Sequence, residues 1–415
     1  MTGVAPESNP PTRWSETENV KWKTKLTGLG HSSPVVSNGM VFITLAREIG
    51  DPFEPRPDTA PGAHDNKMVS SKFEFVGLAI RQSDGKIAWE KVLHQAIPHE
   101  GAHVSASLAS ASPVTDGEHV WFFFGTYGMY CLDFDGQLVW KKQLGKMNTK
   151  HGHGEGATPV LHKNTIAVNW DHEGQSFTVA VDKSDGRTMW KQDREEITSW
   201  SSPIVVEHEG TPQLIVPGTN RIRAYDLSSG EVIWQCGGMS HNIVASPVAN
   251  KGMVFVGSSY EKRQMLAIRL AGAKGDITSS TNVVWSRTAR TPYVPSLLLV
   301  DEHVYFLRHY QGILTRLVAE TGEEPTGPFR LGSMNEIYAS PVSSAGHIYV
   351  TDRSGTTAVL TTGKEPETIA VNRLNDRFSA SAAIVDDQII LRGEQHIYCL
   401  SNGNKDKQEK ESDDE

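Results

Sequence analysis

Residues 180–190 read AVDKSDGRTMW and residues 224–234 read AYDLSSGEVIW, so in each segment a glycine stands four positions before a tryptophan. The same spacing recurs in the segments Gly85–Trp89 and Gly136–Trp140. Glycine tolerates the positive φ that a tight hairpin turn requires, and a tryptophan on an outer strand can cover the interface between two sheets. These segments therefore predict repeated β-hairpins, each with a structural tryptophan on its second strand.

A second motif, a small residue followed by proline and an aliphatic residue, recurs along nearly the whole chain. Its copies are Ser33-Pro34-Val35, Ser112-Pro113-Val114, Thr158-Pro159-Val160, Ser202-Pro203-Ile204, Ser246-Pro247-Val248 and Ser340-Pro341-Val342, with degenerate copies at Ser296-Leu297-Leu298 and Ser381-Ala382-Ala383. The steps between the central positions are 79, 46, 44, 44, 50, 44 and 41 residues. Only the first step departs from a period of about 45 residues, a length typical of propeller repeats.

The residues between successive triplets supply four strands. Each triplet precedes a short turn and an apolar run such as 41–43, a third strand such as 129–132 follows, and a glycine turn leads to the fourth. Eight repeats of four strands predict an all-β fold, a single eight-bladed β-propeller of four-stranded antiparallel blades.

The two ends of the repeat array indicate how the ring closes. Residues 19–26 resemble a fourth strand without its first three, and the last repeat ends after its third strand, so the propeller is expected to span 19–400. We therefore expect 19–26 to join the last blade. Residues 47–76 are expected to form a loop insertion in the first blade. We expect residues 1–18 to run extended over the surface and the acidic tail 401–415 to be disordered.

The composition is that of a globular protein, with 38% hydrophobic and 21% charged residues. The net charge of −9 and the lack of a stripe of lysine and arginine argue against nucleic-acid binding. No run of 18 apolar residues occurs, so we expect no membrane span. Cys131, Cys236 and Cys399 lie far apart in the sequence and are expected to be buried free thiols. We expect a monomer.

The pattern Ala/Cys-x-Asp-x-x-x-Gly-x-x-x-Trp at 180–190 and 224–234 resembles the PQQ-type repeat. Proteins with this repeat include quinoprotein alcohol dehydrogenases, the propeller lipoprotein of the bacterial outer-membrane assembly machine, and exported planctomycete propellers. The resemblance covers roughly 19 to 400 and implies a bacterial propeller that is periplasmic or exported. The chain opens with MTGVAPESNPPTRW and no hydrophobic leader, so a cytoplasmic location is the alternative if this start is complete.

The resemblance also bears on cofactors. Dehydrogenases of this family usually bind PQQ with Ca²⁺ and hold a disulfide between two adjacent cysteines against the quinone. No two cysteines are adjacent in this chain, and no residues can be matched one by one to the calcium ligands. We therefore expect no PQQ–calcium cofactor and leave open a divalent transition metal.

A ligand site is expected on the face that carries the loops between blades and the loops between second and third strands, which we call the top face. The candidate ligand-binding residues there are His31, His103, Glu155, Trp200, Arg221, His241, Tyr293, Arg308, Tyr338, Arg353 and Arg377. The arginines could bind an anionic small molecule, a glycan or a peptide carboxylate through forked hydrogen bonds. Alternatively, they tie blades together by pairing with Asp171, Glu336, Asp352 or Glu394.

A metal site is the second hypothesis for the top face. His151, His153, Asp171 and His172 flank the first two strands of the third repeat, and imidazoles with carboxylates suit Zn²⁺, Mn²⁺ or Fe²⁺. Their spacing matches no established metal motif. The alternative is that these histidines hydrogen-bond the loops or line a polar channel.

Two functional classes follow from these features. The first is a non-catalytic binding or scaffold propeller that holds a protein or carbohydrate partner on its top face. The second is an enzyme, either a divergent PQQ-dependent oxidoreductase or a metal-dependent hydrolase or lyase at the channel mouth. Metal content and cofactor binding distinguish the two classes.

Overall fold

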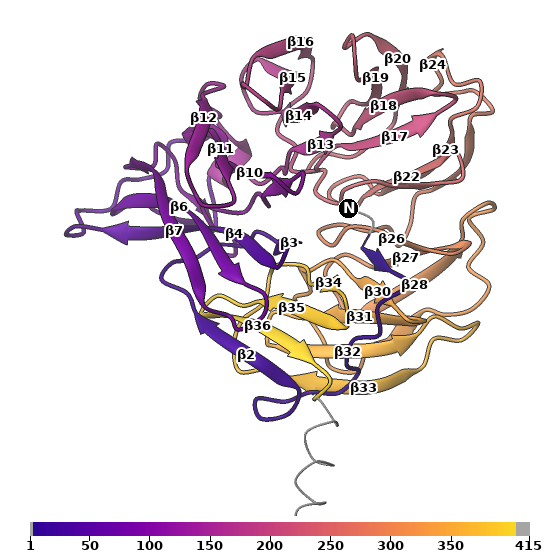
Figure 1. Ribbon diagram of the computed structural model, residues 1–415. Helices are drawn as coiled ribbons and strands as arrows, with labels where there is room; N and C mark the ends of the chain where they lie inside the picture. The colour runs from indigo at the N-terminus through magenta and orange to yellow at the C-terminus, as the bar shows by residue number, and fades with distance from the viewer. Residues whose placement is uncertain (1–2, 404–415) are drawn as a thin grey trace, which may run out of the picture.

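The computed structural model describes residues 3–403 and shows eight small sheets arranged around a central channel (Figure 1). Each sheet is one blade built on four antiparallel strands that lie side by side in order from the channel to the rim. The chain passes once around the ring, as the order of colours in Figure 1 shows. The expected all-β, eight-bladed propeller is confirmed.

In seven of the blades the strands follow one another along the chain from the channel outward, and in blade 8 the N-terminal strand β2 takes the outermost place. Blades 1 to 4 consist of β3 (Val35–Ser37), β4 (Met40–Ile49), β6 (Lys72–Arg81) and β7 (Ile87–Ala96); β9 (Val114–Thr115), β10 (His119–Phe123), β11 (Met129–Asp133) and β12 (Leu138–Lys142); β13 (Val160–His162), β14 (Thr165–Trp170), β15 (Ser176–Asp182) and β16 (Thr188–Arg194); and β17 (Ile204–His208), β18 (Thr211–Val216), β19 (Arg221–Asp226) and β20 (Val232–Gly237). Blades 5 to 8 consist of β21 (Val248–Asn250), β22 (Met253–Ser258), β23 (Gln264–Arg269) and β25 (Val283–Arg287); β26 (Leu298–Val300), β27 (His303–Leu307), β28 (Ile313–Val318) and β29 (Phe329–Arg330); β30 (Val342–Ser344), β31 (His347–Thr351), β32 (Thr356–Thr361) and β33 (Thr368–Arg373); and β34 (Ala383–Val385), β35 (Gln388–Arg392), β36 (His396–Ser401) and β2 (Val20–Lys25).

A few short elements lie outside this plan. They are β1 (Val4–Ala5), the two-stranded sheet of β5 (Asn66–Lys67) and β8 (Ala102–His103), β24 (Gly275–Asp276), and the 3₁₀ turns η1 (Gly125–Tyr127) and η2 (Lys150–Gly152). Strand β24 pairs in parallel with β20 and covers the outer edge of blade 4.

The small residue of each triplet links its blade to the next. The Ser33 backbone N–H donates to Ser112 Oγ at 2.9 Å, and the equivalent bond recurs at every blade boundary, at distances between 2.9 and 3.2 Å. The bond from Ser381 N–H to Ser33 Oγ closes this serine belt. Its members are Ser33, Ser112, Thr158, Ser202, Ser246, Ser296, Ser340 and Ser381. The two degenerate triplets thus keep the hydroxyl acceptor although they lack the proline.

The tryptophans and turn glycines hold the outer halves of the blades together. Trp140 Nε1 donates to the Lys183 carbonyl of the next blade at 2.9 Å, and a Cβ at Gly186 would lie only 2.7 Å from the Trp140 ring. The same arrangement joins Trp22 to Gly85, Trp89 to Gly136, Trp190 to Gly230 and Trp285 to Gly322. The turn glycine is therefore required twice, for its positive φ and for the close approach of the ring.

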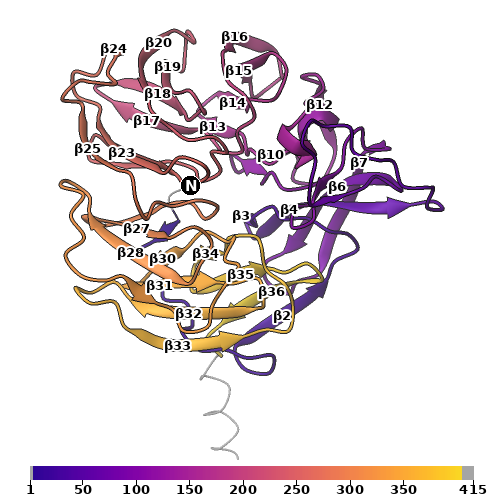
Figure 2. The same cartoon turned by 180° about the vertical axis from the view of Figure 1, so that it is seen from behind.

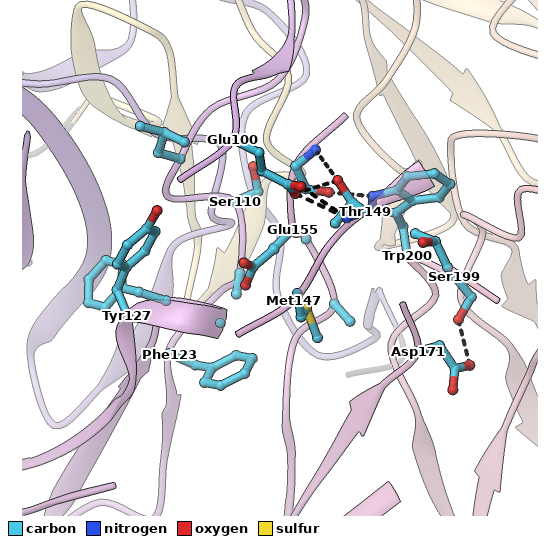
Figure 3. A pocket seen from close by; sticks show the side chains of 18 of the residues that line it. Glu100, Ser110, Phe123, Tyr127, Met147, Thr149, Glu155, Asp171, Ser199 and Trp200 are labelled. Carbon is cyan, nitrogen blue, oxygen red and sulfur yellow. Dashed lines mark hydrogen bonds between the residues drawn. The ribbon is translucent and has the colours of Figure 1, made fainter. Parts of the chain in front are cut away.

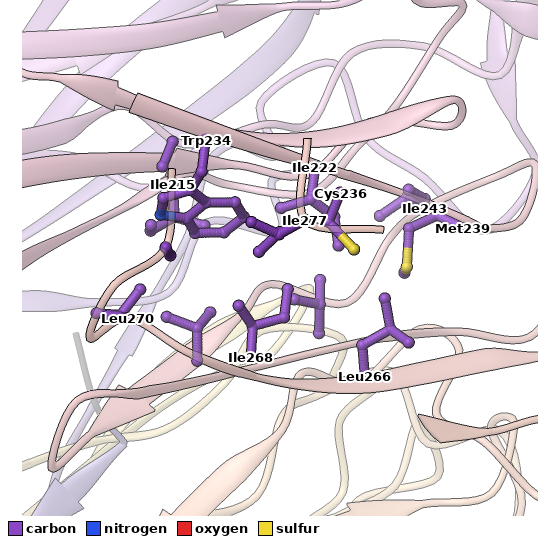
Figure 4. Packing of buried hydrophobic residues seen from close by; sticks show 14 residues of the cluster. Ile215, Ile222, Trp234, Cys236, Met239, Ile243, Leu266, Ile268, Leu270 and Ile277 are labelled. Carbon is purple, nitrogen blue, oxygen red and sulfur yellow. The ribbon is translucent and has the colours of Figure 1, made fainter. Parts of the chain in front are cut away.

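Apolar side chains fill the space between blades. Each of the eight boundaries contains one cluster of buried hydrophobic residues among the residues described. Figure 4 shows the cluster between blades 4 and 5, where Trp234 packs with Ile222 and Ile268 and donates to Gln213 Oε1 of its own blade. The middle strands are buried on both faces, so a strand such as β14 is buried at every position rather than at alternate positions.

The ring closes through the N-terminal strand. Strand β2 pairs antiparallel with β36, with Trp22 opposite Cys399, and the indigo and yellow ends of the chain lie together in Figures 1 and 2. This closure was predicted from residues 19–26 and leaves blade 8 with a complete set of four strands. Cys131, Cys236 and Cys399 are free and buried, as expected.

The N-terminal segment departs from the expected surface path. Strand β1 pairs in parallel with β30, the innermost strand of blade 7, so these residues lie in the central channel (Figure 1). Trp14 is only 4% exposed and stacks on Tyr349 with ring centroids 6.3 Å apart. The inner edge of β30 offers backbone hydrogen bonds to β1, and burial of Trp14 removes a large apolar surface from water. The expected path over the surface is therefore wrong for these residues.

The insertion in blade 1 is also shorter than expected. Strands β4 and β6 pair from Met40↔Arg81 to Ile49↔Lys72, so the loop covers 50–71 rather than 47–76. Arg47 stabilises this extension by donating to Glu74 Oε2 at 2.7 Å. Of the tail 401–415, Ser401 still belongs to β36, and 404–415 lie outside the described residues. The described part of the chain contains no helix long and apolar enough to cross a membrane.

Candidate functional site

The insertion folds over the top loops of blades 2 and 3. Strand β5 of the insertion pairs with β8, and Asn66 Nδ2 donates both to Asp58 Oδ2 at 2.5 Å and to the His151 carbonyl at 2.6 Å. His103 N–H donates to the His153 carbonyl at 3.2 Å. These bonds fix the loop 149–155 beneath the insertion, so two segments far apart in sequence build one site.

A small cavity lies between the top loops of blades 2 and 3 (Figure 3). Glu100, Tyr127, Met147, Glu155 and Trp200 line it, together with backbone of the loop 154–157. Its volume is about 40 Å³, which is room for a few water molecules rather than for a cofactor-sized ligand. Trp200 Nε1 donates to the Gly154 carbonyl at 2.7 Å and holds one wall in place.

Two partly buried glutamates, Glu100 and Glu155, line this cavity. Glu155 accepts hydrogen bonds from Thr126 N–H at 2.7 Å and Thr126 Oγ1 at 2.6 Å, and Glu100 accepts from Thr149 Oγ1 at 2.6 Å. Burial raises the pKa of Glu155 to about 7, against the opposing effect of the Thr126 hydrogen bonds. Burial likewise raises the pKa of Glu100. Glu155 was predicted as a ligand-binding residue; Glu100 was missed because glutamates are ordinarily solvent-exposed loop residues.

The structure brings together a histidine cluster of His64, His103, His151 and His153. Ring centroids of His64 lie 4.7 Å from His151 and 5.0 Å from His153, and His103 lies 4.8 Å from His153. The His153 Nε2 lies 3.2 Å from the His64 carbonyl, which can only accept, so this nitrogen carries the proton. Burial, reinforced by the neighbouring histidines, lowers the pKa of His153 to about 4. His64 comes from the insertion, which sequence periodicity could not place.

The other two predicted metal ligands are engaged elsewhere. Asp171 is fully buried in an ion pair with Arg194, at 2.7 Å from Nε, and accepts from Ser199 Oγ at 2.9 Å. His172 Nδ1 accepts from the backbone N–H groups of Asn148 and Gly174. The four predicted ligands therefore do not form one group. Within residues 3–403, no three His, Cys, Asp or Glu side chains are arranged to hold a metal ion.

The residues also do not fit the PQQ arrangement of the quinoprotein dehydrogenases. Cys131, Cys236 and Cys399 lie in β11, β20 and β36, and each is buried in a different interface between blades. Burial raises the pKa of the Cys131 thiol to about 12, which is the environment of an inert core thiol. No pair of them can therefore place a disulfide against a quinone.

Four of the predicted arginines lie beside carboxylates, two of them beside Glu394, which was one of the expected partners. Arg308 Nη2 lies 2.6 Å from Glu324 Oε1, and Arg221 Nη1 lies 2.8 Å from Asp276 Oδ2 in β24. Arg353 and Arg377 both approach Glu394, at 3.5 and 3.8 Å. Arg221 and Arg308 therefore form close ion pairs away from the channel mouth, whereas Arg353 and Arg377 lie at the mouth at longer distances from Glu394.

Aromatic residues line the top face of blades 5 to 7. Tyr293 stacks on Tyr260 with ring centroids 5.8 Å apart, and Tyr310 lies edge-on to Tyr338 at 5.8 Å. The Arg353 guanidinium carbon lies 4.9 Å above the Tyr338 ring. We call Tyr260, Tyr293, His309, Tyr310 and Tyr338 the aromatic arc.

Two predicted histidines lie near these groups. His241 is half exposed and pairs with Glu261 at 3.2 Å. His31 lies 3.8 Å from Glu394. Of the two, only His31 is therefore placed beside the arginines of the channel mouth.

Comparison with known proteins agrees with this architecture. A family model described as outer membrane protein assembly factor BamB matches residues 12–169, 72–326 and 175–408. The ranges overlap, as expected when a model of several repeats aligns at more than one position along a repetitive chain. Together they extend over the whole ring.

Two curated proteins and two solved structures are similar to the chain. The outer membrane protein assembly factors BamB of Yersinia pestis and Moranella endobia are each 22% identical over 58% of this chain. The matched part spans about half of each relative, 51% and 52%. The crystal structure of BamB from Moraxella catarrhalis covers 91% of this chain and 98% of its own, with 13% identity and a TM-score of 0.59. The computationally designed Ika8 protein covers 91% and 97%, with 11% identity and a TM-score of 0.57.

Proposed function

Because this chain belongs to the family of PQQ-type propellers described as outer membrane protein assembly factor BamB, we propose that it is a non-catalytic scaffold that binds a protein partner through its top face. The observation that carries the proposal is the family match across the ring, residues 12–408. The top-face cavity of about 40 Å³ also supports a non-catalytic role, because most of the polar groups that line this cavity already form hydrogen bonds within the protein. A role in assembling outer-membrane proteins, as in the names of the relatives, is part of the proposal.

The partner surface we propose is the sheet of β5 and β8 and its surroundings. Met68 and Val104 directly follow β5 and β8 and are 55% and 51% exposed, and Ile97, which directly follows β7, is 42% exposed. Exposed apolar side chains on a rigid, hydrogen-bonded platform are suited to a protein interface, where apolar burial supplies affinity. A carbohydrate that stacks on the aromatic arc is the alternative partner.

Location in the bacterial envelope belongs to the same proposal. The relatives are named as outer-membrane assembly factors, and we propose a periplasmic or exported location for this chain. Fractionation of the native bacterium, followed by antibody detection, tests it. Detection only in the cytoplasmic fraction would contradict an envelope role.

Site-specific photo-crosslinking tests the partner surface. A photoreactive residue at Val104 should form cross-links in cells to a protein of the outer-membrane assembly machinery. The double variant Met68→Asp, Ile97→Asp should abolish these cross-links, because it places charge in the apolar contact. Val371→Asp is the matched control, since Val371 is 65% exposed on the outer strand β33. Equal loss in both variants, or cross-links unchanged by either, would contradict the proposed surface.

One observation favours an enzyme as the second candidate. A buried glutamate with a pKa of about 7, such as Glu155, can exchange a proton at neutral pH. Thermal unfolding with PQQ plus Ca²⁺, and with Zn²⁺ or Mn²⁺, tests this alternative. A ligand bound only by the folded state stabilises it by about 2.7 kcal/mol at a hundredfold excess over its Kd. Stabilisation by PQQ would argue for an oxidoreductase, and stabilisation by a transition metal for a site at the histidine cluster.

A further inference from the structure

Three rings of the histidine cluster form a triangle with nearly equal sides. The ring centroid of His64 lies 4.7 Å from that of His151 and 5.0 Å from that of His153. The third side, between His151 and His153, measures 5.4 Å. Three imidazoles on one tetrahedral zinc ion have centroids about 5 Å apart, because the Zn–N bond is about 2.0–2.1 Å long and the centroid lies about 1.1 Å beyond the nitrogen. The three rings are therefore spaced as ligands of a single metal ion.

Hydrogen bonds to backbone carbonyls identify the free nitrogen of each ring. His64 Nδ1 lies 2.8 Å from the Gly62 carbonyl. His151 Nδ1 lies 3.2 Å from the Pro61 carbonyl, and His153 Nε2 lies 3.2 Å from the carbonyl of His64. A carbonyl only accepts, so these nitrogens carry the ring protons. In the neutral rings the opposite nitrogens hold lone pairs, and no described residue forms a hydrogen bond to them.

The insertion supplies all three carbonyl acceptors, because residues 61, 62 and 64 belong to the loop 50–71. Histidines that bind a metal usually donate their other ring N–H to a carbonyl or a carboxylate, which orients the ring. The insertion therefore contributes one ring of the triangle and the groups that orient all three. The other two rings belong to the loop 149–155 on the top face.

The fourth histidine of the cluster differs from the other three. His103 lies 4.8 Å from His153 between ring centroids, but its Nδ1 accepts a hydrogen bond from the backbone N–H of Ser105 at 3.1 Å. The ring proton of neutral His103 is therefore on Nε2, which leaves no free lone pair. His103 thus lies beside the triangle without the chemistry of a ligand.

We propose that His64, His151 and His153 bind one divalent transition metal ion of the zinc type and thereby link the insertion to the top loop of blade 3. Imidazole is a preferred ligand of such ions, and a water completes the tetrahedron when the protein supplies three ligands. His64 is exposed, so the ion can enter from solvent. The site requires no catalysis and does not rest on the proposed scaffold role.

Binding requires one adjustment of the rings. Within the part of the chain that the structure describes, the three lone pairs are not arranged around one point. Rotation of an imidazole about its Cβ–Cγ bond moves the nitrogens but leaves the ring centroid nearly in place, so the triangle keeps its dimensions. The exposed His64 can turn with loss of only its bond to the Gly62 carbonyl, while His151 and His153 keep theirs.

Isothermal titration calorimetry of the full chain with ZnCl₂ tests the proposal, after removal of metal with EDTA and dialysis. We expect saturable binding of one Zn²⁺ per chain and no binding of Mg²⁺, which prefers oxygen ligands. His64→Ala and His151→Ala should each weaken Zn²⁺ binding by about 100-fold or more, since even loss of a group that orients a ligand weakens binding about 10–100-fold. His103→Ala is the matched control and should leave the affinity nearly unchanged. Absence of saturable binding, or equal weakening by His103→Ala and His64→Ala, would overturn the proposal.

Amide hydrogen exchange tests whether the metal links the two segments. The Val104 N–H donates to the carbonyl of Asp65 in the insertion at 2.7 Å, so it reports how firmly the insertion is held. Saturating Zn²⁺ should slow exchange at Val104 several-fold in the parent protein but not in His64→Ala. The Thr158 N–H, which donates to Ser202 Oγ in the ring, should exchange equally with and without the metal. Unchanged exchange at Val104 while Zn²⁺ is bound would contradict ligation by His64.

Discussion

Replacement of one serine of the belt should weaken the ring at one defined hydrogen bond. In Ser202→Ala, the backbone N–H of Thr158 loses its acceptor, which lies at 2.9 Å, while Ser202 N–H can still donate to Ser246 Oγ. An N–H group left without a partner costs about 1–3 kcal/mol. Thr158 is only partly buried, so water can partly replace the serine, and we expect a loss of about 1 kcal/mol.

Ser202→Thr is the matched control, because threonine already occupies the equivalent position 158 and keeps a hydroxyl acceptor. Urea unfolding of the three proteins gives the difference in unfolding free energy from the midpoints, provided that the m-value is unchanged. Amide hydrogen exchange reports the bond itself: Thr158 should exchange roughly fivefold faster in Ser202→Ala, as about 1 kcal/mol of local stability implies. Equal destabilisation by alanine and threonine, or unchanged exchange at Thr158, would refute the account of the belt.

Three further predictions concern the glycine turns and the buried charges. Gly186→Ala should cost about 1–3 kcal/mol more than Gly272→Ala in urea unfolding, because both have φ of +72° but only Gly186 is covered by a tryptophan; equal costs would contradict this. Between pH 4.5 and 7, the native Glu155 keeps a proton that the unfolded chain releases, so stability should fall by about 3 kcal/mol as pH rises; Glu155→Gln should remove this slope. Asp171→Asn should cost about 3–5 kcal/mol by leaving a buried arginine unpaired, whereas the exposed Asp276→Asn should cost about 1 kcal/mol or less.

The fold could be predicted from the repeat because the residues that specify each hairpin lie close together in the sequence. The turn glycine and the tryptophan four residues later specify a hairpin and its outer face. The number of triplets gives the number of blades. Even the closing strand could be inferred, since a lone fourth strand at one end and a missing fourth strand at the other complement each other. The degenerate triplets at Ser296 and Ser381 were placed by spacing, and the belt shows that their hydroxyls serve as acceptors.

The partners of the top-face side chains were accessible only in the folded ring. Asp171 has the chemistry of a metal ligand, yet Arg194 on the outermost strand of the same blade pairs with it. His64 joins His151 because an insertion with no periodicity folds across two blades. Val4 lies in the channel because β1 pairs with the inner edge of β30, which is far away in the sequence. Hairpins form from residues near in sequence, whereas a site is made by side chains from different blades, whose distances depend on loop conformation and packing that no local pattern encodes.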